Sequence, residues 1–329
     1  MSETFLEDNF GRRIDYLRLS VTDRCDLRCS YCLPKGFRDF GEPDHWLNFE
    51  EMTRVVQAFT ELGVQRVRLT GGEPLVRRDL PLLAGQLAQL PGLTDLSLSS
   101  NCTRMDKLAG PLYEAGVRRL NVSLDSLREE VFARVTGGGK LHKVLRGIEA
   151  AQQAGFAPIR INTVAMRGVN DQEIETLLDF CAARGFTLRL IETMPVGSTG
   201  RDALEDFVDL QTVKRRLEQR FTLTPDVQPG GGPARYYRVA GSDTRIGLIT
   251  PLSQHFCDTC NRVRLNAEGT LHLCLGQEHN YPLRDVLRRG AGVEDLKDHL
   301  RTAITLKPQR HEFREKPSQV VRFMAMTGG

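Results

Sequence analysis

Residues 14–32 read IDYLRLSVTDRCDLRCSYC, a strand-like run followed directly by a loop that contains three cysteines. The first part, 14–21, alternates apolar and polar side chains, as a β-strand does. Amphipathic segments separate it from later runs, and two of them, 49–62 and 173–184, repeat apolar residues at helical spacing. Repeated strand–helix alternation predicts a parallel sheet covered by helices. The further strands are expected at 64–70, 94–100, 118–124, 158–166 and 187–193.

The six expected strands carry polar side chains at every second position. A parallel strand buried on both faces is almost continuously apolar, and a closed eight-stranded barrel has an apolar interior. Six units are also too few to close such a barrel, so we expect an open barrel with a large polar cavity. The alternative, one solvated face, fits repeated helical crossovers less well. The polar set is Arg18, Ser20, Arg66, Arg68, Thr70, Ser97, Ser99, Asn121, Ser123, Arg160, Asn162 and Arg189.

The five arginines of this set predict a strongly anionic ligand in the cavity, with phosphate first, because guanidinium groups bind phosphate through paired hydrogen bonds.

The strand–helix rhythm ends near residue 195. A helix is expected at 204–220, and DVQPGGGPA at 226–234 is typical of a linker or loop. The run RVRLNAEGTLHLC at 262–274 predicts a β-hairpin that turns at 267–269. We therefore expect a barrel region at 1–200 and a smaller C-terminal region at 201–329.

Composition narrows the class of protein. The chain has 329 residues, 40% of them hydrophobic and 26% charged, with a formal net charge of +3. These values are ordinary for a soluble globular protein and too mild to indicate nucleic-acid binding. No apolar run approaches the roughly 20 residues that span a bilayer, and MSETFLEDNF lacks the features of a signal peptide. We expect a cytoplasmic protein that binds neither nucleic acid nor membrane.

Six of the eight cysteines form two groups of three, which suits metal ligation better than disulfides. The first group is Cys25-x3-Cys29-x2-Cys32. A cubane [4Fe–4S] cluster usually has four thiolate ligands, so three would leave one iron open. Zinc with a distant fourth ligand is the alternative, although zinc loops more often use paired Cys-x-x-Cys.

A second feature supports a ligand site beside this loop. Gly71-Gly72-Glu73-Pro74 follows the second strand, and its glycines allow the backbone to approach a ligand. Ligands of parallel sheets gather at the carboxyl ends of the strands. Ser99, Ser123 and Met194 lie at or just beyond such ends, so we expect them in the same pocket.

The second group is Cys257-x2-Cys260-x13-Cys274, at the edges of the expected hairpin. Zinc is one possible occupant, with a histidine as fourth ligand. A second cluster with an open iron is the other, and we favour it because arginines between the cysteines suit an anionic substrate. The nearby histidines are His255, His272 and His279, and the arginines are Arg262 and Arg264.

The first cysteine spacing, with Tyr31 before the third cysteine, resembles the radical S-adenosylmethionine (SAM) superfamily. Within it the chain is similar to the GTP 3′,8-cyclase family, molybdenum cofactor biosynthesis protein A, over almost its whole length. The stretches that carry the resemblance are LRLSVTDRCDLRCSYC, RLTGGEPLVRRDL, NVSLDSL, RLIETMPVG, GLITPLSQHFCDTCNRVRL and the terminal Gly328-Gly329.

The resemblance implies an α/β fold, an incomplete (βα)6 TIM-like barrel whose open side is closed by the C-terminal region. It implies two [4Fe–4S] clusters and SAM as cofactors. The residues implied are Cys25, Cys29 and Cys32 for the first cluster; Cys257, Cys260 and Cys274 for the second; Tyr31, Gly72, Ser123 and Met194 for SAM; and Arg18, Arg68, Ser99, Arg160, Arg262 and Arg264 for GTP, with Arg66, Arg189, Gly328 and Gly329 as further candidates.

The implied reaction is abstraction of the ribose 3′-hydrogen of GTP by a 5′-deoxyadenosyl radical, followed by attack of the carbon radical on guanine C8. The implied partners are an electron donor and a downstream cyclic pyranopterin monophosphate synthase that receives the product. The protein is expected to be a monomer or homodimer. Two alternatives are another radical SAM enzyme with an auxiliary cluster, and a zinc-stabilised binding protein without catalysis.

Several positions depart from the family pattern. Ser99-Ser100-Asn101-Cys102 stands where Thr-Thr-Asn-Gly is frequent, Leu33 where Met is frequent, and Arg160 where Lys is common. Cys102 is the hardest to place, since it is either a small residue near the cavity or a stray metal ligand. Cys181 lies on the apolar stripe of a helix and is expected in the core.

Overall fold

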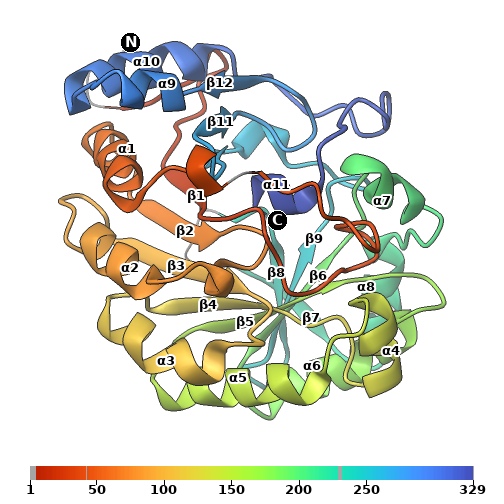
Figure 1. Cartoon of the computed structure of the whole chain (residues 1–329). Coiled ribbons are helices and arrows are strands. Elements are labelled where there is room, and N and C mark those ends of the chain that lie inside the picture. Colours follow the sequence, from red (N-terminus) through yellow and green to blue (C-terminus); the bar gives the residue numbers. More distant parts are fainter. Residues whose placement is uncertain (1–4, 42, 229–231, 329) are drawn as a thin grey trace.

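Six parallel strands form the centre of the fold and pair in chain order (Figure 1). A computed structural model describes residues 5–41, 43–228 and 232–328. All six predicted strands are confirmed, each within a few residues of its expected bounds. They are β1 (Tyr16–Ser20), β2 (Arg66–Thr70), β3 (Asp95–Ser100), β4 (Arg119–Ser123), β5 (Ile159–Val164) and β6 (Thr187–Ile191).

Helices connect these strands and cover the outer side of the curved sheet (Figure 1). The helices predicted at 49–62 and 173–184 are α1 and α6. The side chain of Asn48 caps α1 by accepting from the Glu51 N–H. The six helices are α1 (Phe49–Glu61), α2 (Leu80–Ala88), α3 (Met105–Glu114), α4 (Glu129–Val135), α5 (Leu141–Gln153) and α6 (Ile174–Ala182).

The C-terminal region extends this sheet at both edges. β10 (Arg262–Leu265) pairs in parallel with β1, and β9 (Arg245–Ile249) pairs in parallel with β6. The result is a 12-stranded sheet whose order is β12-β11-β10-β1-β2-β3-β4-β5-β6-β9-β8-β7. The partial barrel is therefore continued by strands from far along the chain. The remaining strands are β7 (Leu223–Asp226), β8 (Arg235–Val239), β11 (Thr270–His272) and β12 (Asn280–Pro282).

For the part of the chain after residue 195, the structure confirms the predicted hairpin and shortens the predicted helix. The hairpin at 262–274 is confirmed, since β10 and β11 are antiparallel neighbours. The helix expected from residue 204 begins only at Leu210, where Asp209 caps it by accepting from the Gln211 N–H. The first six residues of that prediction were wrong. The later helices are α7 (Gly197–Asp202), α8 (Leu210–Glu218), α9 (Arg284–Arg288), α10 (Val293–Thr305) and α11 (Met324–Thr327).

The apolar and polar sets of the six strands separate as the alternation predicts. The apolar members, such as Leu17, Leu69 and Val122, are buried in one core cluster with helix residues such as Phe59 and Leu177. Burial of this apolar surface against the helices stabilises the barrel wall. None of the helices in the described ranges is long and apolar enough to cross a membrane.

Candidate functional site

A single cavity at the carboxyl ends of the strands brings both cysteine groups together. It has a volume of about 290 Å³. Residues from the barrel, from β10 and from the C-terminal tail form its walls. The predicted residues that line it are Arg18, Cys25, Cys29, Tyr31, Cys32, Arg68, Gly72, Ser99, Ser123, Arg189, Met194, Cys257, Cys260, Arg262, Arg264 and Cys274.

Five arginines of this cavity have no carboxylate partner among the described residues: Arg18, Arg68, Arg189, Arg262 and Arg264. Burial and the charges of Arg264 and Arg68 hold the pKa of Arg18 well below its usual value. Burial, with neighbouring arginines, lowers the pKa of both Arg189 and Arg264 to about 10. The buried Nε of Arg18 lacks a hydrogen-bond partner. The cavity therefore has unbalanced positive charge that an anionic ligand would neutralise.

The two carboxylates at the cavity wall do not provide this balance. Glu73 accepts hydrogen bonds from the Leu75 N–H (3.0 Å), the Asn101 N–H (2.7 Å) and the Ser100 hydroxyl (2.8 Å). Glu192 accepts from the backbone N–H groups of residues 252 and 253 at 2.9 and 3.0 Å. Both carboxylates are therefore committed to holding loops in place.

Two predicted arginines do not line the cavity. Arg66 is the first residue of β2 and pairs with Asp15 at 2.5 Å, near the amino ends of the strands. Arg160 is the second residue of β5 and is buried. Alternation assigned both to the inner face correctly, but it contains no information on depth along the strand. A role for Arg66 and Arg160 in binding the ligand therefore stays a prediction from the sequence.

The Gly-Gly-Glu-Pro loop packs against the first cysteine loop. The Gly72 N–H donates to Thr22 O at 2.8 Å, and the Glu73 N–H donates to Arg24 O at 2.8 Å. A Cβ atom at Gly72 would lie 2.3 Å from Arg24 O. Space for a ligand was the reason predicted for these glycines. The structure adds another, the close approach of the backbone that precedes Cys25.

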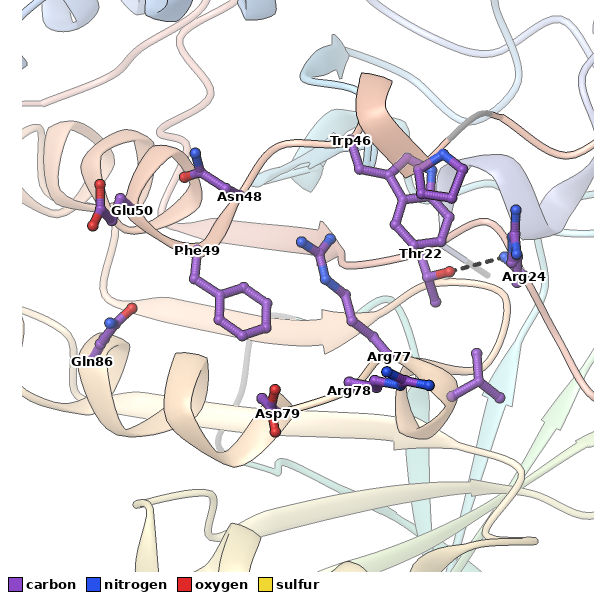
Figure 2. A pocket seen from close by; sticks show the side chains of 12 residues that line it. Thr22, Arg24, Trp46, Asn48, Phe49, Glu50, Arg77, Arg78, Asp79 and Gln86 are labelled. Atoms are coloured by element: carbon purple, nitrogen blue, oxygen red, sulfur yellow. Dashed lines mark hydrogen bonds between the residues drawn. The ribbon is translucent and has the colours of Figure 1, made fainter.

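Arg77 supports the start of the first cysteine loop from its outer side (Figure 2). Its guanidinium donates to Val21 O at 2.6 Å and to Leu47 O at 2.7 Å. Figure 2 shows this group between the rings of Trp46 and Phe49, which lie 5.5 and 4.8 Å from it. These residues line a separate outer hollow of about 730 Å³. Arg77 thus joins the end of β1 to the segment before α1.

Asp125 is a site residue that sequence reasoning missed. Its carboxylate accepts from the Tyr31 hydroxyl at 2.8 Å and from the Val164 N–H at 2.9 Å. Burial raises its pKa to about 6. The residue lies in the quoted NVSLDSL stretch, two positions after Ser123, which was the available signal. It fixes the ring of Tyr31 beside the first cysteines.

The C-terminal tail reaches the cavity. Met324 and Ala325 of α11 line it, and Figure 1 places α11 at the barrel opening. Arg264 donates a hydrogen bond to Gly328 O. A Cβ atom at Gly328 would lie 2.4 Å from Thr70 Cγ2, so the tail passes close to β2. Gly329, predicted with it, lies outside the described residues.

The two cysteines outside the groups are both buried in the core cluster. Cys181 lies on α6, as predicted. Cys102 has a φ of 61°, in the left-handed region that favours glycine. The family preference for glycine at this position thus has a backbone reason. Cys102 does not line the cavity, and its N–H donates to Ser100 Oγ at 2.8 Å.

Comparisons with known proteins agree with this geometry. The family model described as radical SAM superfamily matches residues 19–181, and Molybdenum Cofactor Synthesis C matches residues 186–313. A protein named GTP 3′,8-cyclase from Ectopseudomonas mendocina is 47% identical, over 98% of each chain. GTP 3′,8-cyclase 1 from Pseudomonas aeruginosa is 48% identical, also over 98% of each.

The chain belongs to the GTP 3′,8-cyclase family.

The fold is also similar to a solved structure of low sequence identity. Streptococcus suis SuiB bound to S-adenosylmethionine aligns with a TM-score of 0.62 at 13% sequence identity. The alignment covers 96% of this chain and 78% of SuiB. At this identity the similarity concerns the fold alone, and it agrees with a radical SAM partial barrel.

The cysteines of each group lie close enough for their charges to interact. Burial raises the pKa of Cys29 well above its ordinary value, and the charges of Cys32 and Cys25 contribute. Burial likewise raises the pKa of Cys257, with contributions from Cys274 and Cys260. Burial thus favours the neutral thiols of Cys29 and Cys257, whereas at Cys260 the charges of Lys307 and Arg262 outweigh burial and lower the pKa to about 7. The thiolate is the form that binds iron.

Proposed function

We propose that the protein is a lyase that converts GTP to (8S)-3′,8-cyclo-7,8-dihydroguanosine 5′-triphosphate, the first step of molybdenum cofactor biosynthesis. The observation that carries the proposal is the single cavity, which is lined by both groups of three cysteines and by five arginines that have no carboxylate partner among the described residues. Membership of the GTP 3′,8-cyclase family supports the same substrate and reaction.

The first group, Cys25, Cys29 and Cys32, would hold one [4Fe–4S] cluster. Tyr31, Gly72, Ser123 and Met194 line the same cavity and would bind SAM. When bound, the cluster and SAM supply a 5′-deoxyadenosyl radical, a hydrogen abstractor that no side chain provides. Cys257, Cys260 and Cys274 would hold the second [4Fe–4S] cluster. The barrel at 1–200 would thus contribute the SAM half of the site, and 201–329 the second-cluster half.

The arginines would bind the triphosphate. Arg264, Arg18 and Arg68 lie at the same register on three neighbouring strands, β10, β1 and β2. Strands are about 4.8 Å apart, so three guanidinium groups point into one region. Arg262 and Ser99 line the same cavity. Arg189 is held by donation to Asn162 Oδ1 at 2.8 Å and to Asn121 Oδ1.

Arg160 and Arg66 do not line the cavity, so their proposed roles are less direct. Arg160 is buried close enough to Arg189 to lower its pKa, so it adds positive charge from behind the wall. Arg66 is neutralised by Asp15 and would not contact GTP.

The other task of the chain is to position GTP and exclude water from a reactive radical. α11 covers the cavity through Met324 and Ala325, and Arg264 fixes the tail through Gly328. Gly328 would then lie within reach of the bound substrate, and Gly329 stays a candidate from the sequence. An electron donor and a downstream cyclic pyranopterin monophosphate synthase remain the proposed partners. Cytoplasmic location and a monomeric or homodimeric state stay predictions from the sequence.

Turnover tests the proposal. The protein is reconstituted anaerobically with iron and sulfide, reduced, and mixed with SAM and GTP. Mass spectrometry follows 5′-deoxyadenosine and isomers of GTP. Both products are expected, and both should be absent in Cys25→Ala. Deoxyadenosine with unchanged GTP would refute the cyclase proposal, and neither product at full iron loading would refute radical SAM chemistry as well.

A further inference from the structure

Three buried cations from distant parts of the chain contact the second cysteine group. Arg12, near the N-terminus, donates to Cys257 O at 2.9 Å. Lys307, just after α10, donates to Cys260 Sγ at 3.6 Å. Arg322, before α11, donates to Cys274 O at 3.0 Å. Each cysteine is therefore held by its own cation, and of these only Lys307 reaches a sulfur.

Lys307 uses its whole ammonium group at this site. Besides Cys260 Sγ, its Nζ donates to Leu273 O at 2.6 Å and to Arg262 O at 3.1 Å. Leu273 immediately precedes Cys274, and Arg262 follows Cys260 by two residues. One side chain thus joins the backbone beside the second cysteine to the backbone beside the third.

The burial of Lys307 calls for an anion. Its exposure is 3%, and no carboxylate within the described ranges lies at ion-pair distance from it. A buried ammonium without an opposite charge is costly, and a lysine in an apolar site is expected to have a partner. The sulfur of Cys260, to which the Nζ of Lys307 donates, is a group that can bear negative charge. A thiolate bound to iron would supply that charge permanently.

We propose that Lys307 is a positioning residue for the second iron–sulfur site, where it sets the separation of Cys260 and Cys274 and raises the reduction potential of the cluster. The inference rests on the proposed second cluster. Hydrogen bonds to cluster sulfurs and nearby positive charge favour the reduced, more negative state. Removing the charge should therefore lower the potential, and removing the hydrogen bonds should loosen the site.

The test isolates the second site. In a background of Cys25→Ala, Cys29→Ala and Cys32→Ala, only the second group remains. Two variants separate charge from hydrogen bonding: Lys307→Gln keeps two N–H donors without charge, and Lys307→Met keeps neither. Lys316→Met is the matched control, because Lys316 has a 61% exposed side chain that pairs with Glu312. Iron and sulfide per chain, the rate of iron loss to a chelator and the potential from an EPR-monitored titration are measured.

We expect a more negative potential in both Lys307 variants and iron loss several-fold faster in Lys307→Met, with Lys316→Met like the background. If Lys307→Met does not fold, the potential of Lys307→Gln decides. An unchanged potential in Lys307→Gln overturns the inference while the second cluster stands. A background that binds no iron overturns the second cluster, and the inference with it.

Discussion

Replacing Gly72 with alanine tests the contact between the two loops of the SAM half. The added Cβ would lie 2.3 Å from Arg24 O and 2.6 Å from both Arg24 C and Asp23 O. All three are backbone atoms, so no side chain can rotate away. Ordinary contact distances are about 3.5 Å or more, and the cysteine loop must therefore move by about 1 Å.

The cost follows from two effects. Overpacking of this kind costs about 1–3 kcal/mol. The movement also weakens the two backbone hydrogen bonds that Gly72 and Glu73 donate to the loop, each worth about 0.5–1.5 kcal/mol. We expect a loss of about 2–6 kcal/mol in the free energy of unfolding. For a chain of 329 residues this corresponds to a melting temperature lower by about 3–9 °C.

The assay is thermal unfolding of the cluster-free protein, with iron content of the first site after reconstitution. Iron is counted in a background of Cys257→Ala, Cys260→Ala and Cys274→Ala. Gly85→Ala is the control, because nothing lies within 4 Å of a Cβ there and alanine stabilises a helix by up to about 1 kcal/mol. Gly72→Ala should lose both stability and iron. A melting temperature and iron content equal to those of Gly85→Ala would refute the steric argument.

Two further changes probe charge in the cavity. Arg18→Met removes a cation that lies close to the like charges of Arg264 and Arg68, so the melting temperature of the ligand-free protein should be no lower than that of wild type. The dissociation constant for GTP, measured by calorimetry, should rise about 10-fold or more, because one charge-assisted hydrogen bond is lost. A less stable protein with unchanged GTP affinity would contradict this. Burial raises the pKa of Glu73 from 4.5 to about 7. Its contribution to stability is therefore full below about pH 4.5 and lost as pH rises through 7. In Glu73→Gln the melting temperature of the cluster-free protein should depend less on pH across this window. If the pH dependence is unchanged, a group other than Glu73 causes it.

Local patterns in the sequence were sufficient to predict the six strands of the barrel and the side chains that face its helices. Alternation along each strand reflects which side chains face the helices, so the apolar and polar sets were assigned correctly. The motifs with cysteines and glycines lie on loops at one rim, because parallel strands end on the same side. That is why the first cysteine loop and the Gly-Gly-Glu-Pro loop were expected at one pocket.

Features that depend on distant pairing could not be predicted. Nothing near residues 245–265 indicates that β9 and β10 flank the barrel on opposite edges. The buried contacts of Arg12 and Lys307 join segments more than 40 residues apart to the cysteines. The alternation of side chains likewise does not show how far along a strand a residue lies. For that reason Arg66 was predicted in the cavity, whereas the structure shows it paired with Asp15.

The most direct test of the proposed reaction uses GTP that carries deuterium at the ribose 3′ position. The reconstituted, reduced protein is given SAM and this substrate, and the masses of 5′-deoxyadenosine and the nucleotide product are measured. The account predicts 5′-deoxyadenosine heavier by one deuterium, together with a cyclised product that has lost it. Unlabelled 5′-deoxyadenosine, formed while the deuterium stays in GTP, would contradict the account.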